Sequence, residues 1–249
     1  MIMSAPRMYN DLVWIWPFVS PPEEYAEEVA TFRRRFQGKG VSDGSTVLHL
    51  GSGGGSIDHH LANHYKVTGV DISAGMRQIA ARLNPGVEYQ HGDIRDVRLG
   101  RTFDAVLLHD ASSYMISIEE LLAAYRTAAA HLEPGGVMVT LPEEIRSRFQ
   151  QHKTSAWTHA VGDRVVSTME TDFDPDPTDT WFETTYVYLI RDGSQVTVEV
   201  DTHKSGLFHL EDMLAAMREA GFEPEVSPWE LSELDPDEDY PLVTAVKRG

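Results

Sequence analysis

One stretch constrains the fold of this chain more than any other: a short apolar run that leads into a glycine-rich loop. Residues 47–50 read Val-Leu-His-Leu, and four of the five residues in 51–55 are glycine. A short apolar run before such a loop is typical of a strand buried in a parallel sheet. Glycines let the main chain turn tightly and let a ligand lie against it. The stretch therefore predicts a nucleotide-like ligand at the end of a central strand.

Segments that fit strands alternate with segments that fit helices along most of the chain. The predicted strands are residues 47–50, 66–70, 87–90, 103–108, 137–141, 222–226 and 242–247. Helices are predicted between them, over residues 57–64, after Ser73, and after Ser117, which forms a capping box with Glu120. Such alternation places strands in parallel, joined by right-handed crossovers. We therefore predict an α/β fold with a doubly wound, mostly parallel, Rossmann-like sheet of seven strands.

Residues 1–40 are predicted to form an aromatic segment followed by a helix. Ser20 and Glu23 fit a capping box for that helix. Its apolar stripe consists of Tyr25, Val29, Phe32 and Phe36. The preceding 20 residues include Tyr9, Trp14 and Trp16, so we expect this segment to dock on the rest of the protein. It either covers part of the core or forms a lid over the ligand pocket.

The alternation changes near residue 150, where an antiparallel β insertion is predicted after the fifth strand. Residues 151–163 show no clear period, whereas residues 164–171, 181–190 and 195–201 fit strands. Val196, Val198 and Val200 alternate with polar residues, as in a half-buried strand. We expect a single domain, 1–249, with four parts: residues 1–40, a ligand-binding core at 45–150, the insertion at 151–205, and a last helix with two strands at 206–249. The acidic segment 230–239 is expected to be a solvated connection.

Composition excludes several classes of protein and site. The formal net charge of −18 argues against nucleic-acid and anionic membrane partners, because both require a basic surface. No cysteine is present, which removes disulfides, thiolate nucleophiles and cysteine metal sites. His60 and His64 are four residues apart on a predicted helix but lack a third ligand, so no metal is predicted. We find neither a membrane-length apolar run nor a signal-peptide pattern, and we expect a cytoplasmic protein.

The residues best placed for chemistry follow the predicted strands. In this class of sheet, ligands bind at the carboxyl ends of the strands. Those ends carry the glycine loop, Asp71, Asp93-Ile94 and His109-Asp110. Asp71 lies 20 residues beyond Gly51, a spacing typical of a carboxylate that binds ribose hydroxyls. Ser56 stands where a pyrophosphate-binding loop has its third glycine, so the pattern favours a nucleoside over a dinucleotide without excluding the latter.

These motifs together resemble those of the class I S-adenosylmethionine-dependent methyltransferases. The resemblance covers residues 45–141 in the order of that family: Val47–Gly55, Val67–Ser73, Gly92–Ile94, Phe103–Val106 and Leu132–Gly136. It implies S-adenosyl-L-methionine as cofactor and S-adenosyl-L-homocysteine as product. The cofactor-binding residues that we predict on this basis are His49, Gly51, Ser52, Gly53, Gly55, Asp71, Ile72, Met76, Gly92, Asp93, Ile94 and His109. In these roles Asp71 would bind the ribose, Asp93 the adenine amine and Ile94 the face of the ring.

His49 departs from the pattern of this family. An acidic residue usually stands at its position and helps to hold the methionine amine of the cofactor. The resemblance leaves open whether His49 replaces that contact or weakens it.

A narrower resemblance links the chain to small-molecule N,N-dimethyltransferases that act on nucleotide-linked amino sugars. It rests on residues 92–101, the β insertion and the run 203–208. It implies a small-molecule acceptor with an amine, approached from the insertion and the N-terminal segment. We predict His109, Asp110 and Tyr114 as catalytic residues, because each follows the fourth strand, and Tyr9, Trp14, Trp16 and His203 as substrate-binding residues. A homodimer is also compatible with this prediction.

Three alternatives remain at the level of sequence. The acceptor group could be a hydroxyl or a carbon atom of a natural product. The chain could be a nicotinamide oxidoreductase, although no Tyr-x-x-x-Lys pair follows the fourth strand. It could also be a protein that binds an S-adenosyl ligand without catalysis.

Overall fold

The computed structural model describes residues 6–229, 231–232 and 240–249. Most of the acidic segment 230–239, predicted as a solvated connection, lies outside the described residues. None of the helices within the described ranges has the length and apolar character needed to cross a membrane.

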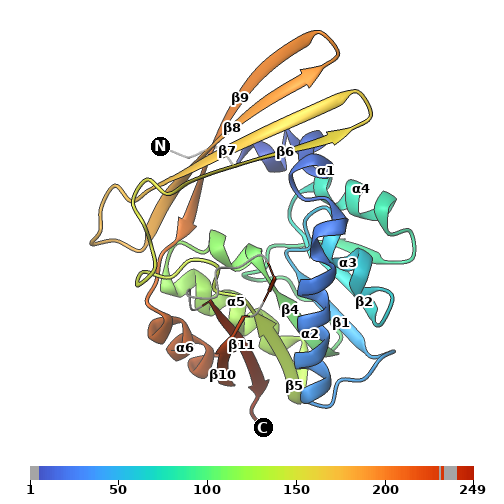
Figure 1. The fold of residues 1–249 in the computed structure, drawn as a ribbon. Helices are drawn as coiled ribbons and strands as arrows, with labels where there is room; N and C mark the ends of the chain where they lie inside the picture. The colour runs from blue at the N-terminus through green and yellow to red at the C-terminus, as the bar shows by residue number, and fades with distance from the viewer. Residues whose placement is uncertain (1–5, 230, 233–239) are drawn as a thin grey trace.

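A seven-stranded sheet forms the centre of the molecule (Figure 1). Its strand order is β10-β11-β5-β4-β1-β2-β3. The strands are β1 (Thr46–Leu50), β2 (Lys66–Asp71), β3 (Glu88–His91), β4 (Phe103–Leu108), β5 (Leu132–Thr140), β10 (Phe222–Pro228) and β11 (Pro241–Lys247). Neighbours from β5 to β3 run parallel, whereas β11 is antiparallel to both β5 and β10. The predicted α/β class and mostly parallel seven-stranded sheet are confirmed.

Helices cover both faces of this sheet. Helices α2 (Ala26–Gly38) and α3 (Ser56–Leu61) lie on one face, and α5 (Ile118–Ala130) and α6 (Leu210–Glu219) on the other (Figure 1). Because successive strand side chains point to opposite faces, β1 contributes to two separate cores. Leu48 packs in the core beneath α5 and α6, whereas Val47 packs beneath α2 and α3. The same alternation directs His49 toward α3.

Two of the three predicted N-cap residues are confirmed by their capping hydrogen bonds. Ser73 Oγ accepts from the Met76 N–H at 3.2 Å and caps α4 (Ala74–Leu83), and Ser117 Oγ accepts from the Glu120 N–H at 3.2 Å. The predicted cap at Ser20 is wrong, because α2 begins only at Ala26, after a 3-10 turn over Pro22–Tyr25. Ser20 instead bonds through its hydroxyl to the Tyr25 hydroxyl at 2.8 Å, and its carbonyl accepts from Ser56.

The insertion forms a second, antiparallel sheet in the order β6-β7-β8-β9. Its strands are β6 (Thr154–Val161), β7 (Arg164–Phe173), β8 (Trp181–Asp192) and β9 (Gln195–Gly206). Strand β6 falls within residues 151–163, for which no element was predicted. It lies at the edge of the sheet and none of its side chains is fully buried, so its sequence lacks the apolar alternation that marks a half-buried strand.

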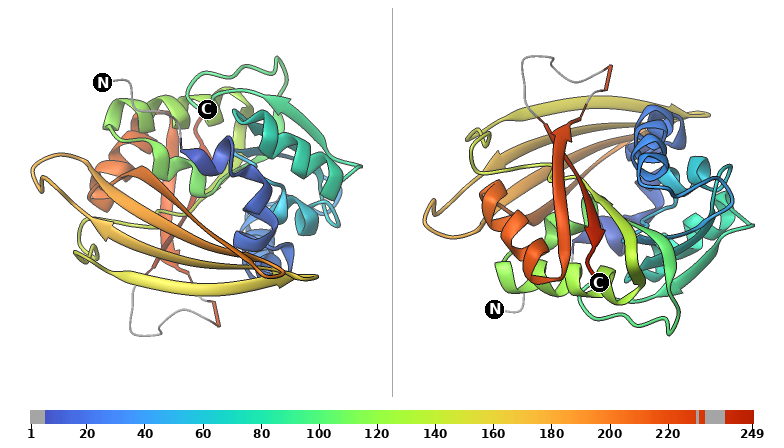
Figure 2. Two further views of the ribbon diagram at one scale, coloured as in Figure 1. Left: turned by 90° about the horizontal axis from the view of Figure 1, so that it is seen from above. Right: turned by 90° about the horizontal axis from the view of Figure 1, so that it is seen from below.

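The face of the insertion sheet that is buried is the opposite of the one predicted. Val196, Val198 and Val200 are about half exposed, on the face turned away from the core, so their predicted burial is wrong. The opposite face carries Val166, Tyr188 and Ile190, which pack against the N-terminal segment in one core cluster with Met8, Leu12 and Ile15. Figure 2 shows this sheet as a curved layer over the N-terminal segment.

The N-terminal segment lies between the insertion sheet and the central sheet (Figure 1). It consists of the 3-10 turns η1 (Arg7–Tyr9) and η2 (Val13–Ile15) and the short helix α1 (Trp16–Val19). Its aliphatic side chains cover the core, while Tyr9 and Trp16 line a cavity. The segment therefore covers part of the core and also lines the cavity, while its role as a lid stays a prediction.

Candidate active site

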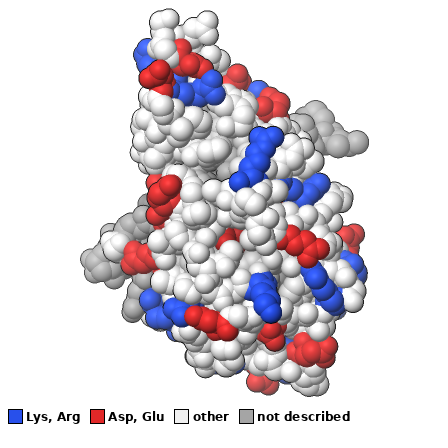
Figure 3. All heavy atoms as spheres, turned by 90° about the vertical axis from the view of Figure 1, so that its right-hand side faces the viewer, with Lys and Arg blue, Asp and Glu red and all other residues white. Residues whose placement is uncertain are grey.

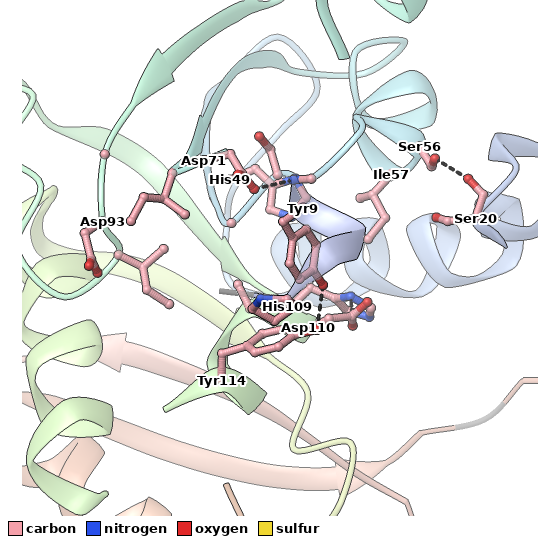
Figure 4. Close-up of a pocket in the computed structure, with 18 of the residues that line it drawn as sticks. Tyr9, Ser20, His49, Ser56, Ile57, Asp71, Asp93, His109, Asp110 and Tyr114 are labelled. Atoms are coloured by element: carbon pink, nitrogen blue, oxygen red, sulfur yellow. Dashed lines mark hydrogen bonds and ion pairs between the residues drawn. The ribbon is translucent and has the colours of Figure 1, made fainter. Parts of the chain in front are cut away.

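The carboxyl ends of β1, β2, β3 and β4 open into one cavity of about 290 Å³. This volume lies near the lower end of the range for small-molecule sites. Most residues that the sequence predicted for the site line it: Tyr9, Trp16, His49, Gly51, Ser52, Gly53, Asp71, Ile72, Gly92, Asp93, Ile94, His109, Asp110 and Tyr114. In Figure 4, Asp71, His49 and Asp93 lie on one side of Tyr9, with His109, Asp110 and Tyr114 on the other.

Four predicted residues do not line the cavity. Gly55 and Met76 support it from behind, since Gly55 is the N-cap residue of α3 and Met76 is fully buried in α4. His203 lies one hydrogen bond away, at Tyr114. Trp14 is 40% exposed, and its ring lies 5.1 Å from the Arg164 guanidinium at a separate surface hollow. Leu12 and Ile15 take the inward positions of this turn, which directs Trp14 outward.

The glycine loop requires glycine for both turning and close approach. Gly51 and Gly53 have φ angles of 78° and 52°, in the left-handed region that other residues rarely occupy. A Cβ on Gly54 would overlap the Trp16 ring, so the N-terminal segment packs directly on the loop backbone.

Asp71 connects the loop to β2 and α4. Its Oδ2 accepts from the Gly53 N–H at 2.9 Å and its Oδ1 from the Ser73 N–H at 2.7 Å. Asp71 is only 8% exposed, and its burial raises the pKa of the carboxyl. The two hydrogen bonds lower this pKa, but the effect of burial is larger. Each oxygen retains a further acceptor site. Asp71 can therefore hold the loop and bind a ligand hydroxyl at once.

Asp93 is held by a strong partner that sequence reasoning missed. Arg95 donates to both of its carboxylate oxygens, at distances from 2.6 to 3.1 Å, and continues to Glu120 at 2.6 Å. The Arg95 guanidinium holds the pKa of Asp93 below its ordinary value. The adjacent Ile94 is buried and lines the cavity, while Ile72 is 60% exposed beside it.

His49 forms a buried pair with Asp58, a second residue that sequence reasoning missed. Its Nδ1 lies 2.7 Å from Asp58 Oδ1, and both side chains are almost fully buried. The other ring nitrogen, Nε2, is buried and has no hydrogen-bond partner among the described residues. The available signal was strand alternation, which directs His49 toward the helix that follows the glycine loop.

His109 and Asp110 form a close pair at the end of β4. His109 Nδ1 contacts Asp110 Oδ1, and His109 Nε2 lies 3.3 Å from Glu28 Oε2 of α2. Burial disfavours the imidazolium, but these two carboxylates outweigh it and raise the pKa of His109. Partial burial also opposes ionisation of Asp110, yet the adjacent imidazolium lowers its pKa. The Asp110 side chain is 47% exposed and lines the cavity, so it presents a carboxylate there.

A chain of hydrogen bonds leads from the cavity into the insertion sheet. The Tyr9 hydroxyl lies 2.6 Å from the Tyr114 hydroxyl, which lies 2.8 Å from His203 Nδ1. His203 Nε2 then lies 2.9 Å from Asp201 Oδ2, which also accepts from the Met8 N–H at 2.8 Å. The chain joins the N-terminal segment, the loop after β4 and strand β9, so it couples the insertion to the cavity.

The described residues contain no group of three or more His, Cys, Asp or Glu that could hold a metal ion. His60 is engaged elsewhere, with its Nε2 2.7 Å from the Pro22 carbonyl oxygen.

Comparison with known proteins agrees with the geometry of the cavity. A family model described as a methyltransferase domain matches residues 47–136. A dTDP-3-amino-3,6-dideoxy-alpha-D-glucopyranose N,N-dimethyltransferase from Streptomyces fradiae is 32% identical over 205 residues, which span 82% of this chain and 78% of that protein. A dTDP-4-amino-2,3,4,6-tetradeoxy-D-glucose N,N-dimethyltransferase from Saccharopolyspora spinosa is 30% identical over 190 residues, spanning 76% and 75%.

Solved structures show the same architecture over the whole chain. The sugar N-methyltransferase KedS8 from Streptoalloteichus superposes with a TM-score of 0.82 at 26% identity, covering 100% of this chain and 96% of that one. The likeness therefore includes the insertion sheet as well as the central sheet.

The cavity fits the cofactor of these enzymes. A nucleoside needs a loop whose backbone approaches it closely, a carboxylate for its ribose and apolar side chains for its base. Gly51–Gly53 provide the loop, Asp71 the carboxylate and Ile94 an apolar side chain. A positively charged sulfonium suits a cavity lined by Asp71 and Asp110, since the third carboxylate, Asp93, is paired with Arg95. The buried, unpartnered Nε2 of His49 leaves one polar contact for the rest of the ligand. The chain is an enzyme that uses S-adenosyl-L-methionine, and it belongs to the methyltransferase family that includes these dTDP-amino-sugar N,N-dimethyltransferases.

Proposed function

We propose that this methyltransferase acts on the amine of a small sugar-like metabolite linked to a nucleotide. Two curated relatives are named for dTDP-amino sugars, and this chain covers at least three quarters of each. The observation that carries the proposal is the Asp110 carboxylate, ionised and held at the cavity by His109. A carboxylate in that position is suited to receive the ammonium form of an amine.

We assign the two sides of the cavity to the two substrates. The cofactor side comprises the ends of β1, β2 and β3: His49, Gly51, Ser52, Gly53, Asp71, Ile72, Gly92, Asp93 and Ile94, with Gly55 and Met76 behind them. The acceptor side comprises Tyr9, Trp16, Asp110 and Tyr114, where the N-terminal segment and the loop after β4 meet. In this assignment Asp93 reaches the adenine amine while Arg95 holds its carboxylate in place.

In the proposed reaction the protein forms no covalent bond with either substrate. S-adenosylmethionine, when bound, supplies a methyl group on a positive sulfur that takes the electron pair of the breaking bond. The amine must be neutral to form the new carbon–nitrogen bond, so Asp110 binds its ammonium form and accepts a proton. Buried and held by Asp110 and Glu28, His109 is a positioning residue. Tyr114 belongs to the hydrogen-bond chain through His203 to Asp201, which fixes its hydroxyl on the acceptor side.

A matched pair of acceptors tests the proposed acceptor group. We expect a dTDP-linked amino sugar to release S-adenosylhomocysteine when incubated with the enzyme and S-adenosylmethionine, while the same sugar with a hydroxyl in place of the amine releases none above background. Liquid chromatography of S-adenosylhomocysteine measures both. Turnover of the hydroxyl sugar, or of a phenol, at the rate of the amine would replace this proposal with O-methylation.

We further propose that the enzyme forms a homodimer through the outer face of the insertion sheet. The cross-strand pairs Val198–Leu189 and Val187–Met169 place apolar side chains side by side on that face. Leu189, Val198 and Met169 are each more than 40% exposed. A contiguous apolar sheet face of this kind is typical of an interface, and a second copy offers the same surface about a two-fold axis.

The dimer is tested by placing charges on this face. We expect unaltered protein to sediment as a dimer, and L189K/V198E to sediment as a monomer with an unchanged circular dichroism spectrum. The matched control T197K changes a neighbouring position and is expected to leave the dimer intact. A monomer before any substitution would contradict the proposal.

We propose no nucleic-acid partner. The net charge is −18, and Figure 3 shows acidic and basic side chains interspersed on the face it presents. A cytoplasmic location stays a prediction.

A further inference from the structure

The pair formed by His49 and Asp58 has the features of a ligand-binding group. His49 lines the cavity, yet its side chain is only 2% exposed and Asp58 behind it is fully buried. Nδ1 is directed to Asp58 at 2.7 Å. Nε2, on the opposite side of the ring, is left without a partner among the described residues. A buried polar atom without a partner is costly, so this nitrogen is suited to contact a ligand.

Asp58 determines which kind of contact His49 can make. An ionised carboxylate accepts from Nδ1–H, which places the proton of the neutral ring on Nδ1. Nε2 then carries a lone pair and can only accept. The pair as a whole has one negative charge, and it presents this charge through the imidazole. A donor with positive charge is the complementary ligand group.

The surroundings of the pair add to its preference for a cation. Asp71 of β2 and Asp110 after β4 both interact electrostatically with His49. Tyr89 of β3 lies against Asp58 and is uncharged at neutral pH, since burial and the nearby carboxylate raise its pKa. Within the part of the chain that the structure describes, no basic side chain hydrogen-bonds to His49 or Asp58.

We propose that the His49–Asp58 pair binds the α-ammonium group of the methionine part of the cofactor, with His49 Nε2 as acceptor and Asp58 as the source of the negative charge. This inference rests on the proposed cofactor side of the cavity. It gives a physical role to the position at which His49 departs from the family pattern, because the carboxylate is retained in α3, one side chain further from the ligand.

Two ligands that differ only in the amino-acid part test the proposal. S-adenosylhomocysteine carries the ammonium group, whereas 5′-methylthioadenosine has the same nucleoside and thioether without it. We expect H49A to weaken S-adenosylhomocysteine binding roughly tenfold or more, as for a lost hydrogen bond to a charged group, and to change methylthioadenosine binding less than about twofold. Isothermal titration calorimetry measures both dissociation constants. H91A, at an exposed histidine outside the cavity lining, serves as the control.

A second variant keeps the test independent of the folding of H49A. D58N removes the charge while retaining the shape, and we expect the same selective loss.

The outcomes separate this inference from the proposed site. If both ligands bind the unaltered protein but H49A and D58N weaken them equally or not at all, only the role of the pair is overturned. Tighter binding of S-adenosylhomocysteine by D58N would assign the pair to the ligand carboxylate and overturn it too. If neither ligand binds, the cofactor side itself is wrong.

Discussion

Replacing Asp71 by alanine is expected to lower the affinity for S-adenosylhomocysteine by roughly two orders of magnitude. The carboxylate accepts hydrogen bonds from Gly53 and Ser73, and in our assignment it also accepts from the ribose. Each hydrogen bond to a charged group contributes about 1.5–3 kcal/mol, and about 2.7 kcal/mol corresponds to a hundredfold change in dissociation constant. The substitution removes the ribose contact and loosens the loop together, so both S-adenosylhomocysteine and methylthioadenosine should be affected.

Calorimetric titration of D71A measures this loss directly. D96A removes a neighbouring acidic residue that is exposed and lies outside the cavity lining, and it should bind like the unaltered protein. A dissociation constant for D71A within about threefold of the control would remove Asp71 from the cofactor side.

Asp110 is expected to affect turnover and leave cofactor binding intact. D110A should reduce kcat by about 10²–10⁴, the usual contribution of a positioned proton acceptor, with an unchanged dissociation constant for S-adenosylhomocysteine. Full turnover by this variant would exclude Asp110 as the proton acceptor. Y114F interrupts the hydrogen-bond chain to His203 without removing the ring, and a smaller reduction is expected.

The pH dependence of turnover provides a second test of Asp110. The carboxylate form is required, and the adjacent His109 holds the pKa of Asp110 below its ordinary value of 3.8 despite partial burial. Protonation of Asp110 therefore removes activity only as pH falls below about 3.8. An acidic limb near neutral pH must then come from another group, such as the acceptor amine, and it should persist in D110N.

Much of the central sheet could be predicted because buried parallel strands are marked by continuous apolar runs. Residues 103–108 were predicted and found as β4, and 47–50 differ from β1 by one residue. The insertion was predicted less well. Strand β6 has no buried stripe, and Val196, Val198 and Val200 face outward, because alternation shows that two faces differ but not which one is buried.

In the candidate site, too, some residues could be predicted from the sequence and others could not. Residues at the strand ends could be predicted, since topology alone brings the ends of parallel strands to one edge. Their partners Asp58, Arg95, Glu28 and Asp201 could not, because each becomes a partner only through folding. Trp14 was predicted to bind the substrate but lies elsewhere on the surface. In a short aromatic segment the geometry of the turns decides which ring faces the cavity, and the sequence does not reveal that geometry.

The central claim is that cofactor and amine meet between the glycine loop and Asp110, beneath the insertion sheet. A crystal structure with S-adenosylhomocysteine and a dTDP-linked amino sugar tests it most directly. We predict the adenosine beside Asp71 and Ile94, and the sugar amine within hydrogen-bond distance of Asp110, facing the sulfur. An amine bound away from Asp110, or a sugar outside the cavity that Tyr9 and Tyr114 line, would contradict this account.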